Sequence, residues 1–163
     1  MPPKGTPRRA AAETPPALPE KLRQGLRLHQ QGKLTEAEQI YREVLRDDPA
    51  CFEALHMLGV VALQTRKTRE SVELITQALQ LNPGVAAAHI NLASALIALT
   101  RFAEALPSLE KAIALKPDFA EAHANRAAAL NALKRHDQAL AHVFSSFGAR
   151  GSNMTRRTDR RKT

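Results

Sequence analysis

A pattern that repeats every 34 residues limits most strongly how this chain of 163 residues can fold. Four kinds of position keep the period without an insertion: two rows of small residues, one row of prolines and one row of basic residues. The small residues are Gly25, Gly59, Ala93 and Ala127, then Ala37, Ser71, Ala105 and Ala139; the prolines are Pro49, Pro83 and Pro117; the basic residues are Lys33, Lys67, Arg101 and Arg135. Such a period predicts a stack of similar supersecondary units rather than one central core.

Residues 86–119 show what one unit contains. Both halves carry residues at positions i, i+3, i+4 and i+7, the spacing of one helical face. These are His89, Leu92, Ala93 and Leu96, then Phe102, Ala105, Leu106 and Leu109. Small residues recur where the two helices meet, since Gly or Ala lets helix axes approach to the short end of the ~8–10 Å range. The predicted unit is a helical hairpin with its turn at residues 99–101, where Arg101 suits the negative end of the first helix.

Prolines bear on where the helices begin. Asp48-Pro49 and Asn82-Pro83 each pair a good N-cap residue with a proline at the first helical position. We therefore expect the first helices of the second and third units to begin there. Pro107 lies about one turn into a second helix, where we expect a kink or a delayed start.

The unit resembles the tetratricopeptide repeat (TPR), a helix–turn–helix unit of the same period. Leu55-x2-Leu58-Gly59, Ala37-x3-Tyr41 and the three prolines carry the resemblance over residues 18 to about 147. The family's tryptophan is missing, and Lys21, Leu55, His89 and His123 occupy its place. The resemblance implies an all-α fold, a right-handed α-solenoid of four TPR helical hairpins with eight helices and disordered basic tails.

The period divides the chain into six segments. Residues 1–17 hold five of the ten prolines and no run of large apolar residues, so we expect a disordered tail. Three repeats follow at 18–51, 52–85 and 86–119, then an incomplete fourth repeat at 120–147 and a disordered basic tail at 148–163. The fourth repeat would leave Ala139, Leu140, Val143 and Phe147 partly uncovered. We therefore expect either a truncated chain or self-association through this uncapped repeat.

The formal net charge of +8 raises the question of nucleic-acid binding. Residues 1–17 carry +2, residues 148–163 carry +5, and the repeats between them carry only +1, from 15 basic and 14 acidic residues. No base-stacking module accompanies the charge. We therefore expect no specific nucleic-acid binding, only a non-specific attraction of the tails. No stretch approaches the ~20 apolar residues that cross a bilayer, and we expect a soluble, cytoplasmic protein.

Groups that could carry catalysis or bind a metal are few. Cys51 is the single cysteine, and we interpret it as a small buried apolar residue. His89 and His123 share one repeat position, which favours packing between helices, whereas His136 and His142 do not share a helical face. No HExxH, glycine-rich phosphate loop, GxSxG motif or catalytic carboxylate pair occurs. We expect no cofactor, no metal and no enzyme activity in this chain.

The most informative surface is the inner face of the first helices, which lines a concave groove in repeats of this type. The residues at groove-facing spacing are small, mildly apolar and nearly uncharged. We predict a peptide-binding groove formed by Glu53, His56, Met57, Val60, Ile90, Asn91, Ser94, Glu121, Asn125, Ala128 and Asn131, with Leu22, Arg23, Leu26, Ala87, Ala98 and Ala124 at the same spacing.

Asn91 and Asn125 are 34 residues apart, so they occupy the same place in consecutive repeats. An asparagine offers a donor and an acceptor, and a row of them could bond the backbone of an extended peptide. The alternative is a structural role, in which each side chain caps local backbone groups. The sequence leaves both interpretations open.

Residues 88–130 resemble the repeats that precede the catalytic domain in protein O-linked N-acetylglucosamine transferases and related bacterial glycosyltransferases. That resemblance implies an asparagine ladder for protein substrates, which Asn91 and Asn125 match and Arg23 and Met57 do not. The carboxylate clamp of chaperone-binding members is not matched, because Leu22, Leu26, Met57, Ala87 and Asn91 stand where it needs mainly basic residues. Two functions stay open: a stand-alone module that binds a peptide or partner segment, and the substrate-recruiting region of a glycosyltransferase or another group-transfer enzyme.

Overall fold

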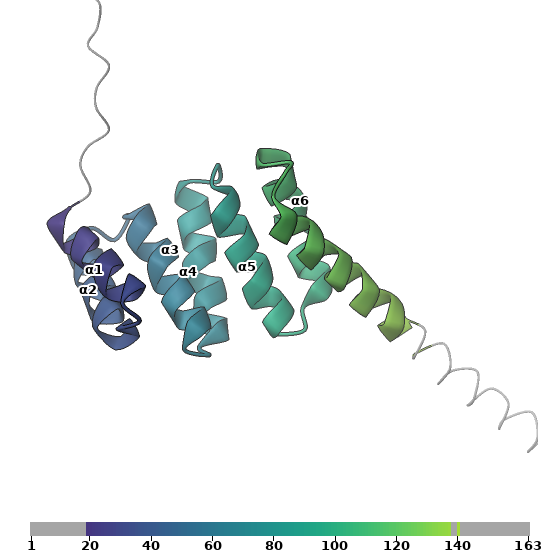
Figure 1. Cartoon of the computed structure of the whole chain (residues 1–163), viewed down its shortest axis with the longest axis horizontal. Coiled ribbons are helices and arrows are strands. Elements are labelled where there is room, and N and C mark those ends of the chain that lie inside the picture. Colours follow the sequence, from purple (N-terminus) through teal and green to yellow (C-terminus); the bar gives the residue numbers. More distant parts are fainter. Residues whose placement is uncertain (1–18, 138–139, 141–163) are drawn as a thin grey trace, which may run out of the picture.

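The computed structural model describes residues 19–137 and residue 140 (Figure 1). Within these residues there are seven helices and no strand: α1 (Glu20–Gln30), α2 (Leu34–Asp47), α3 (Phe52–Gln64), α4 (Thr68–Leu81), α5 (Ala86–Ala98), α6 (Phe102–Leu115) and a helix over residues 120–137. Helix α1 packs on α2, α3 on α4 and α5 on α6, and each pair packs on the next. The predicted all-α solenoid of helical hairpins is confirmed, and the two predicted disordered tails lie outside the described residues.

Each hairpin turns over the same three residues of the repeat. The middle residue of each turn has a left-handed backbone conformation, with φ of 74° at Gly32, 62° at Arg66 and 59° at Thr100. The basic residue that follows is the N-cap of the second helix. Arg101, for example, forms an ion pair of 2.6 Å with Glu104 in the first turn of α6. The row of basic residues therefore marks the starts of the second helices.

The prediction that two first helices begin at Asp48 and Asn82 is wrong. These residues end α2 and α4, and α3 and α5 begin four residues later. Each polar side chain accepts a hydrogen bond from the backbone N–H two residues on, at Ala50 (3.1 Å) and Gly84 (3.0 Å). Asp and Asn readily form this local turn, which uses the same oxygen that would cap a helix.

Pro107 does not delay the start of α6. The helix begins at Phe102, the position equivalent to Leu34 of α2 and Thr68 of α4, and it continues through Pro107 to its end at Leu115. A proline inside a helix removes one backbone hydrogen bond. Buried side chains on both sides of Pro107, at Ala105 and Leu109, hold the helix against its neighbours across this defect.

In the first three repeats the small residues of both rows lie where helices touch, as predicted. A β-carbon added to Gly59 would lie 2.5 Å from Cγ1 of Ile75, and one added to Gly25 would lie 2.7 Å from Cε1 of Tyr41. Both distances are far below the ~3.5–4.0 Å of a favourable carbon–carbon contact. The matching residues of the second helices, Ala37, Ser71 and Ala105, are fully buried.

The fourth repeat departs from the prediction at its turn. Residues 120–137 form one continuous helix, which runs through the predicted turn at residues 133–135. The turn would need a left-handed conformation at Lys134, which costs a non-glycine residue about 1–2 kcal/mol. In the second and third repeats, where Arg66 and Thr100 occupy this position, a buried contact between the two helices offsets this cost. At the fourth, Ala127 is exposed, and Ala139 lies outside the described residues.

Apolar side chains are exposed at this end of the described structure. Leu130 has 43% and Leu140 has 44% of its surface exposed. Val143 and Phe147, which the sequence also placed on an uncovered face, lie outside the described residues. Self-association through the fourth repeat therefore stays a prediction.

Candidate functional site

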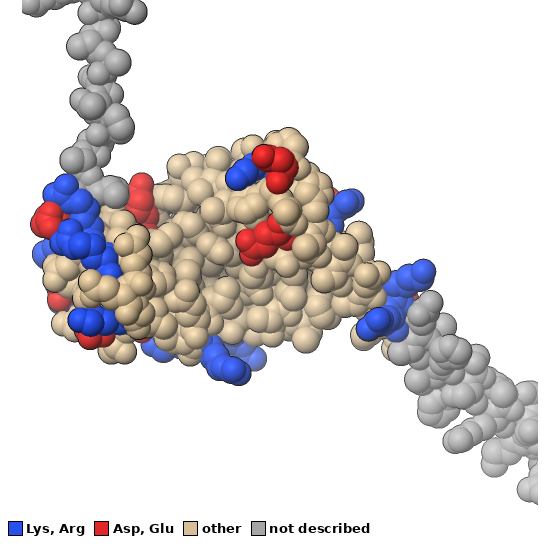
Figure 2. Space-filling view, in the orientation of Figure 1, with Lys and Arg blue, Asp and Glu red and all other residues tan. Residues whose placement is uncertain are grey.

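The first helices α1, α3 and α5 and the helix over residues 120–137 lie along one side of the solenoid, toward the viewer in Figure 1. Their partners α2, α4 and α6 lie behind them. In Figure 2, which has the same orientation, charged side chains gather toward the two ends of this side, and few lie over α3 and α5. We call the surface formed by α1, α3, α5 and residues 120–137 the first-helix face; it is nearly uncharged over α3 and α5. It is the surface to which the predicted groove residues were assigned.

The predicted groove residues lie at three depths. Ile90 and His56 are buried, with 1% and 5% of their surface exposed, and Leu22 at the same repeat position is buried too. Assigning Ile90 and His56 to the groove surface was wrong, because this repeat position packs against neighbouring helices. The half-buried residues are Met57, Val60, Asn91, Ser94 and Asn125, and the exposed ones are Glu53, Glu121, Ala128 and Asn131.

The two asparagines reach sideways to the preceding repeat. The side-chain amide of Asn91 on α5 donates to Nε2 of His56 on α3, at 2.9 Å. The amide of Asn125 donates to Oγ of Ser94 on α5, at 3.4 Å. Neither bond goes to local backbone, so the geometry does not show the capping role that was the alternative interpretation of these asparagines. Each bond uses one amide hydrogen, and an asparagine side chain has a second hydrogen and a carbonyl oxygen besides.

His56 is held as a neutral ring by this arrangement. Burial lowers the pKa of His56 from its ordinary value of 6.5, and the charge of Glu53 opposes this shift. Because Asn91 donates to Nε2, that nitrogen carries no hydrogen and acts as the acceptor. Protonation would place a charge in a buried site and break this hydrogen bond. The folded protein therefore binds a proton at His56 less readily than the unfolded chain does.

Acidification is expected to destabilise the protein through His56. A depressed histidine pKa contributes stability that is fully present above the unfolded pKa and is lost as the pH falls below it. The melting temperature should therefore fall between about pH 7.5 and about pH 5.5. His56→Leu, which places at this position the residue found at Leu22, should reduce that fall. Glu53→Gln should increase it, because the charge that opposes the shift is removed; equal pH dependence in all three proteins would contradict the assignment.

The structure agrees with the interpretations of Cys51 and His89 but not with that of His123. Cys51 is buried, and burial raises the pKa of its thiol, as suits a small core residue rather than a nucleophile. His89 is buried and Nε2–H donates to the carbonyl of Pro83 at 2.9 Å, which confirms its packing role. His123 makes the same bond to Pro117 at 2.7 Å, but its side chain is exposed, so packing is wrong there.

Metal ligands and membrane-spanning helices can be assessed for the residues that the structure describes. Among them no three His, Cys, Asp or Glu side chains come together in a way that could hold a metal ion. None of the helices in this part of the chain combines the length and the apolar character that a bilayer crossing needs.

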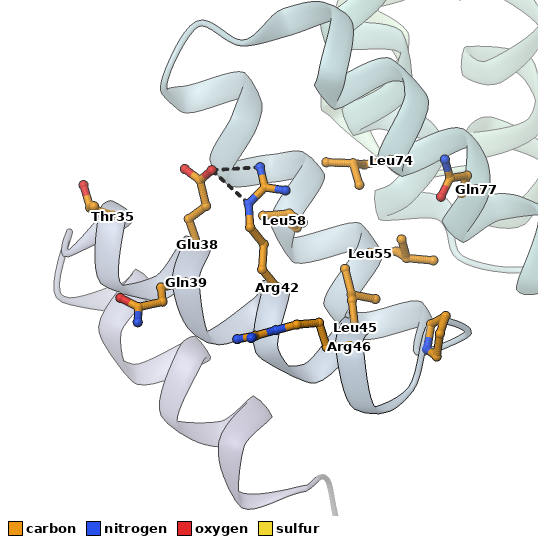
Figure 3. A pocket seen from close by; sticks show the side chains of 11 residues that line it. Thr35, Glu38, Gln39, Arg42, Leu45, Arg46, Leu55, Leu58, Leu74 and Gln77 are labelled. Atoms are coloured by element: carbon orange, nitrogen blue, oxygen red, sulfur yellow. Dashed lines mark hydrogen bonds and ion pairs between the residues drawn. The ribbon is translucent and has the colours of Figure 1, made fainter.

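A cavity of about 750 Å³ lies away from the first-helix face, between α2, α3 and α4 (Figure 3). Its apolar lining includes Leu45, Leu55, Leu58 and Leu74. Leu55 lies about 200° around α3 from Met57, and so nearly on the opposite side of that helix. Sequence reasoning missed this cavity because it considered the first helices alone. The available signal was Leu55 itself, which stands where the next two repeats have histidine.

The sequence matches the family profile described as Tetratricopeptide repeat over residues 22–86, 56–105 and 90–146. Among solved structures, a mutant of the Thermobaculum terrenum O-GlcNAc transferase is 30% identical, with a TM-score of 0.64 over 68% of this chain and 21% of that chain. MamA (AMB-1) is 27% identical, with a TM-score of 0.65 over 76% of this chain and 67% of that one. The first TPR of Spaghetti (RPAP3) bound to the HSP90 peptide SRMEEVD is 23% identical, with a TM-score of 0.68 over 70% and 90%.

These comparisons differ in what they show. The profile matches together span most of the chain, from the first turn of α1 to beyond the last described residue. The chain spans only about a fifth of the transferase that it resembles. The likeness to Spaghetti, at 23% identity, shows the fold alone. A search of curated proteins finds no match to this sequence.

Proposed function

This chain belongs to the tetratricopeptide repeat family, and from that premise we propose that it is a protein-interaction module whose first-helix face binds a peptide or partner segment. The observation that carries the proposal is the pair Asn91 and Asn125. They occupy one repeat position on a nearly uncharged face, and each is half-buried. Polar side chains in such a place can direct a ligand, because surrounding water competes less well for their hydrogen bonds.

The proposed contact is to the main chain of the partner. With one amide hydrogen bonded to the neighbouring repeat, each asparagine is held in a fixed orientation. Its carbonyl oxygen could accept from a backbone N–H, and its second amide hydrogen could donate to a backbone C=O. Ser94 and Ala128 each lie three residues after an asparagine, about one helical turn further on. They are small and leave room for a backbone to approach. Binding of this kind would tolerate many partner sequences.

The location of binding can be tested by NMR. A pool of random dodecapeptides serves as the probe, since a main-chain contact does not depend on peptide sequence. We expect the pool to shift the side-chain amide signals of Asn91 and Asn125 and backbone signals of α3 and α5. Shifts confined to α2 and α4, or no shifts at all, would contradict binding on the first-helix face.

A second function has its own support. The repeats of this chain are 30% identical to part of the Thermobaculum terrenum O-GlcNAc transferase, which favours the alternative that they recruit substrates for a glycosyltransferase or another group-transfer enzyme. In that case the binding face would be the same and catalysis would reside in a separate domain. The genomic sequence downstream of codon 147 separates the two: a glycosyltransferase domain encoded there supports recruitment, and its absence supports a stand-alone module.

A further inference from the structure

The cavity between α2, α3 and α4 has an apolar floor and an open, polar rim. Leu45 of α2, Leu55 and Leu58 of α3 and Leu74 of α4 form the floor together with Pro49. Figure 3 shows the polar side chains around them. A volume of about 750 Å³ falls in the ~300–1,000 Å³ range of ligand sites, which are mostly apolar with a few polar groups.

The repeat position of Leu55 explains why apolar surface faces this cavity. One repeat later His89 occupies the same position, and it donates a hydrogen bond to the carbonyl of Pro83. Leucine has no such donor, so Leu55 cannot bond Pro49 in the same way. Both residues instead line the cavity. The second repeat thus presents a leucine where the third presents a satisfied polar side chain.

Ion pairs between α2 and α4 hold the walls of the cavity in place. Arg42 donates to Glu38 on its own helix at 2.9 Å and to Glu70 on α4 at 2.5 Å. Lys67 at the start of α4 donates to the same Glu38 at 2.9 and 3.0 Å. Lys67 and Arg42 together lower the pKa of Glu38, so the carboxylate stays charged near neutral pH. The network uses the charges of all four side chains to join two consecutive second helices.

Among the charged residues that line the cavity, Arg46 is the one outside this ion-pair network. Its side chain is 74% exposed, and its ion pair with Glu43 is long, at 3.8 Å. Glu38 and Arg42, the other two charged residues of the lining, neutralise each other. Gln39 of α2 and Gln77 of α4 lie toward opposite sides of the opening (Figure 3) and can each donate and accept. The rim therefore has one positive charge to offer and amide groups suited to a peptide backbone.

We propose that the cavity between α2 and α4 is a second docking site, separate from the first-helix face, that binds a protein segment carrying a large apolar side chain beside a carboxylate. The apolar side chain fills the leucine-lined floor, which removes both surfaces from water. The carboxylate pairs with Arg46, whose guanidinium can form two parallel hydrogen bonds to it. Gln39 and Gln77 bond the backbone of the segment on either side.

A displayed library of random dodecapeptides, selected against the wild-type chain, tests this proposal. We expect enriched peptides to pair Leu, Ile, Met or Phe with a nearby Asp or Glu. Arg46→Glu should weaken their binding by about 10- to 150-fold, because a charged hydrogen bond is replaced by repulsion. Gln77→Trp, which places a large side chain at the opening, should abolish it. The proposal would be overturned if no selected peptide carried this pairing, or if the peptides that carry it bound both variants with unchanged affinity.

Each variant has a matched control one repeat later. Gln80 is the equivalent of Arg46 and Lys111 the equivalent of Gln77, and both are exposed. Gln80→Glu and Lys111→Trp should leave binding of the selected peptides unchanged. Replacing Asn91 and Asn125 with alanine should leave binding of these peptides at the cavity unchanged, although it weakens binding at the first-helix face, so failure of this site and failure of the first-helix face can be distinguished. Weakening by the controls as strong as that by Arg46→Glu would show a non-specific effect and contradict the site.

Discussion

Replacing Gly59 with leucine is expected to lower the free energy of unfolding by about 1–3 kcal/mol, the usual cost of overpacking a core. A single β-carbon at this position would already lie 2.5 Å from Cγ1 of Ile75, which is itself fully buried. Helix α3 would have to move away from α4, and with it the contact that builds the second hairpin. Ala93→Leu and Ala105→Leu place the same bulk between α5 and α6 and should cost a similar amount. Such a loss is large against the ~5–15 kcal/mol stability of a typical domain.

Urea unfolding of each variant measures this effect, with Glu110→Leu as the control. Glu110 lies on α6 with its side chain exposed, so the same new residue there should change the free energy of unfolding by less than about 0.5 kcal/mol. If the Gly59, Ala93 and Ala105 variants were no less stable than the control, these positions would not be helix contacts.

The contacts at Gly59 and Ala105 could be predicted because their cause is local and repeated. Two helices in a hairpin meet at a fixed distance from their turn, so the need for a small residue recurs at every 34th position. Helical spacing likewise included Phe102 in the second helix of its repeat. Helix α6 does begin at Phe102, although Pro107 lies inside it. A periodic sequence thus predicts the contacts between the two helices of each repeat.

Features that depend on competition between contacts were harder to predict. Asp48 and Asn82 suit a helix start, yet their side chains bond the backbone two residues on, and the same residue types favour both roles. The turn at Lys134 was expected from the repeat period, which makes Lys134 equivalent to Arg66 and Thr100. The left-handed conformations of those two residues depend on packing beyond the turn. The residue type at one position does not reveal whether that packing is present.

The candidate sites show the same division. Helical spacing correctly placed Asn91 and Asn125 at matching positions, but it also placed Ile90 on the surface, although this residue is 1% exposed. A face defined by spacing alone is broader than the strip that neighbouring hairpins leave uncovered. The bond from Asn91 to His56 could not be foreseen either, because it joins residues 35 apart on different helices.

Replacing both Asn91 and Asn125 with alanine is expected to weaken peptide binding by about 5- to 150-fold. Each lost hydrogen bond is worth about 0.5–1.5 kcal/mol, and the pair lies on the proposed binding face. The loss should be similar for unrelated peptides, because a bond to the main chain carries no information about side chains. Changing Glu53 or Glu121, which are exposed beside the asparagines, should instead alter which peptides bind.

Titration of a peptide set against wild type and the double variant measures this effect. Two controls distinguish direct contact of the asparagines with the peptide from a structural role between repeats. His56→Leu removes the partner of Asn91, and Ser94→Ala removes the partner of Asn125, while both asparagines remain. If the asparagines contact the peptide directly, these controls should lose less affinity than the double variant, since only the orientation of each amide is relaxed. Equal losses would mean that the bonds between repeats matter and the amides do not touch the ligand. Unchanged affinity in the double variant would place peptide binding on another surface of the solenoid.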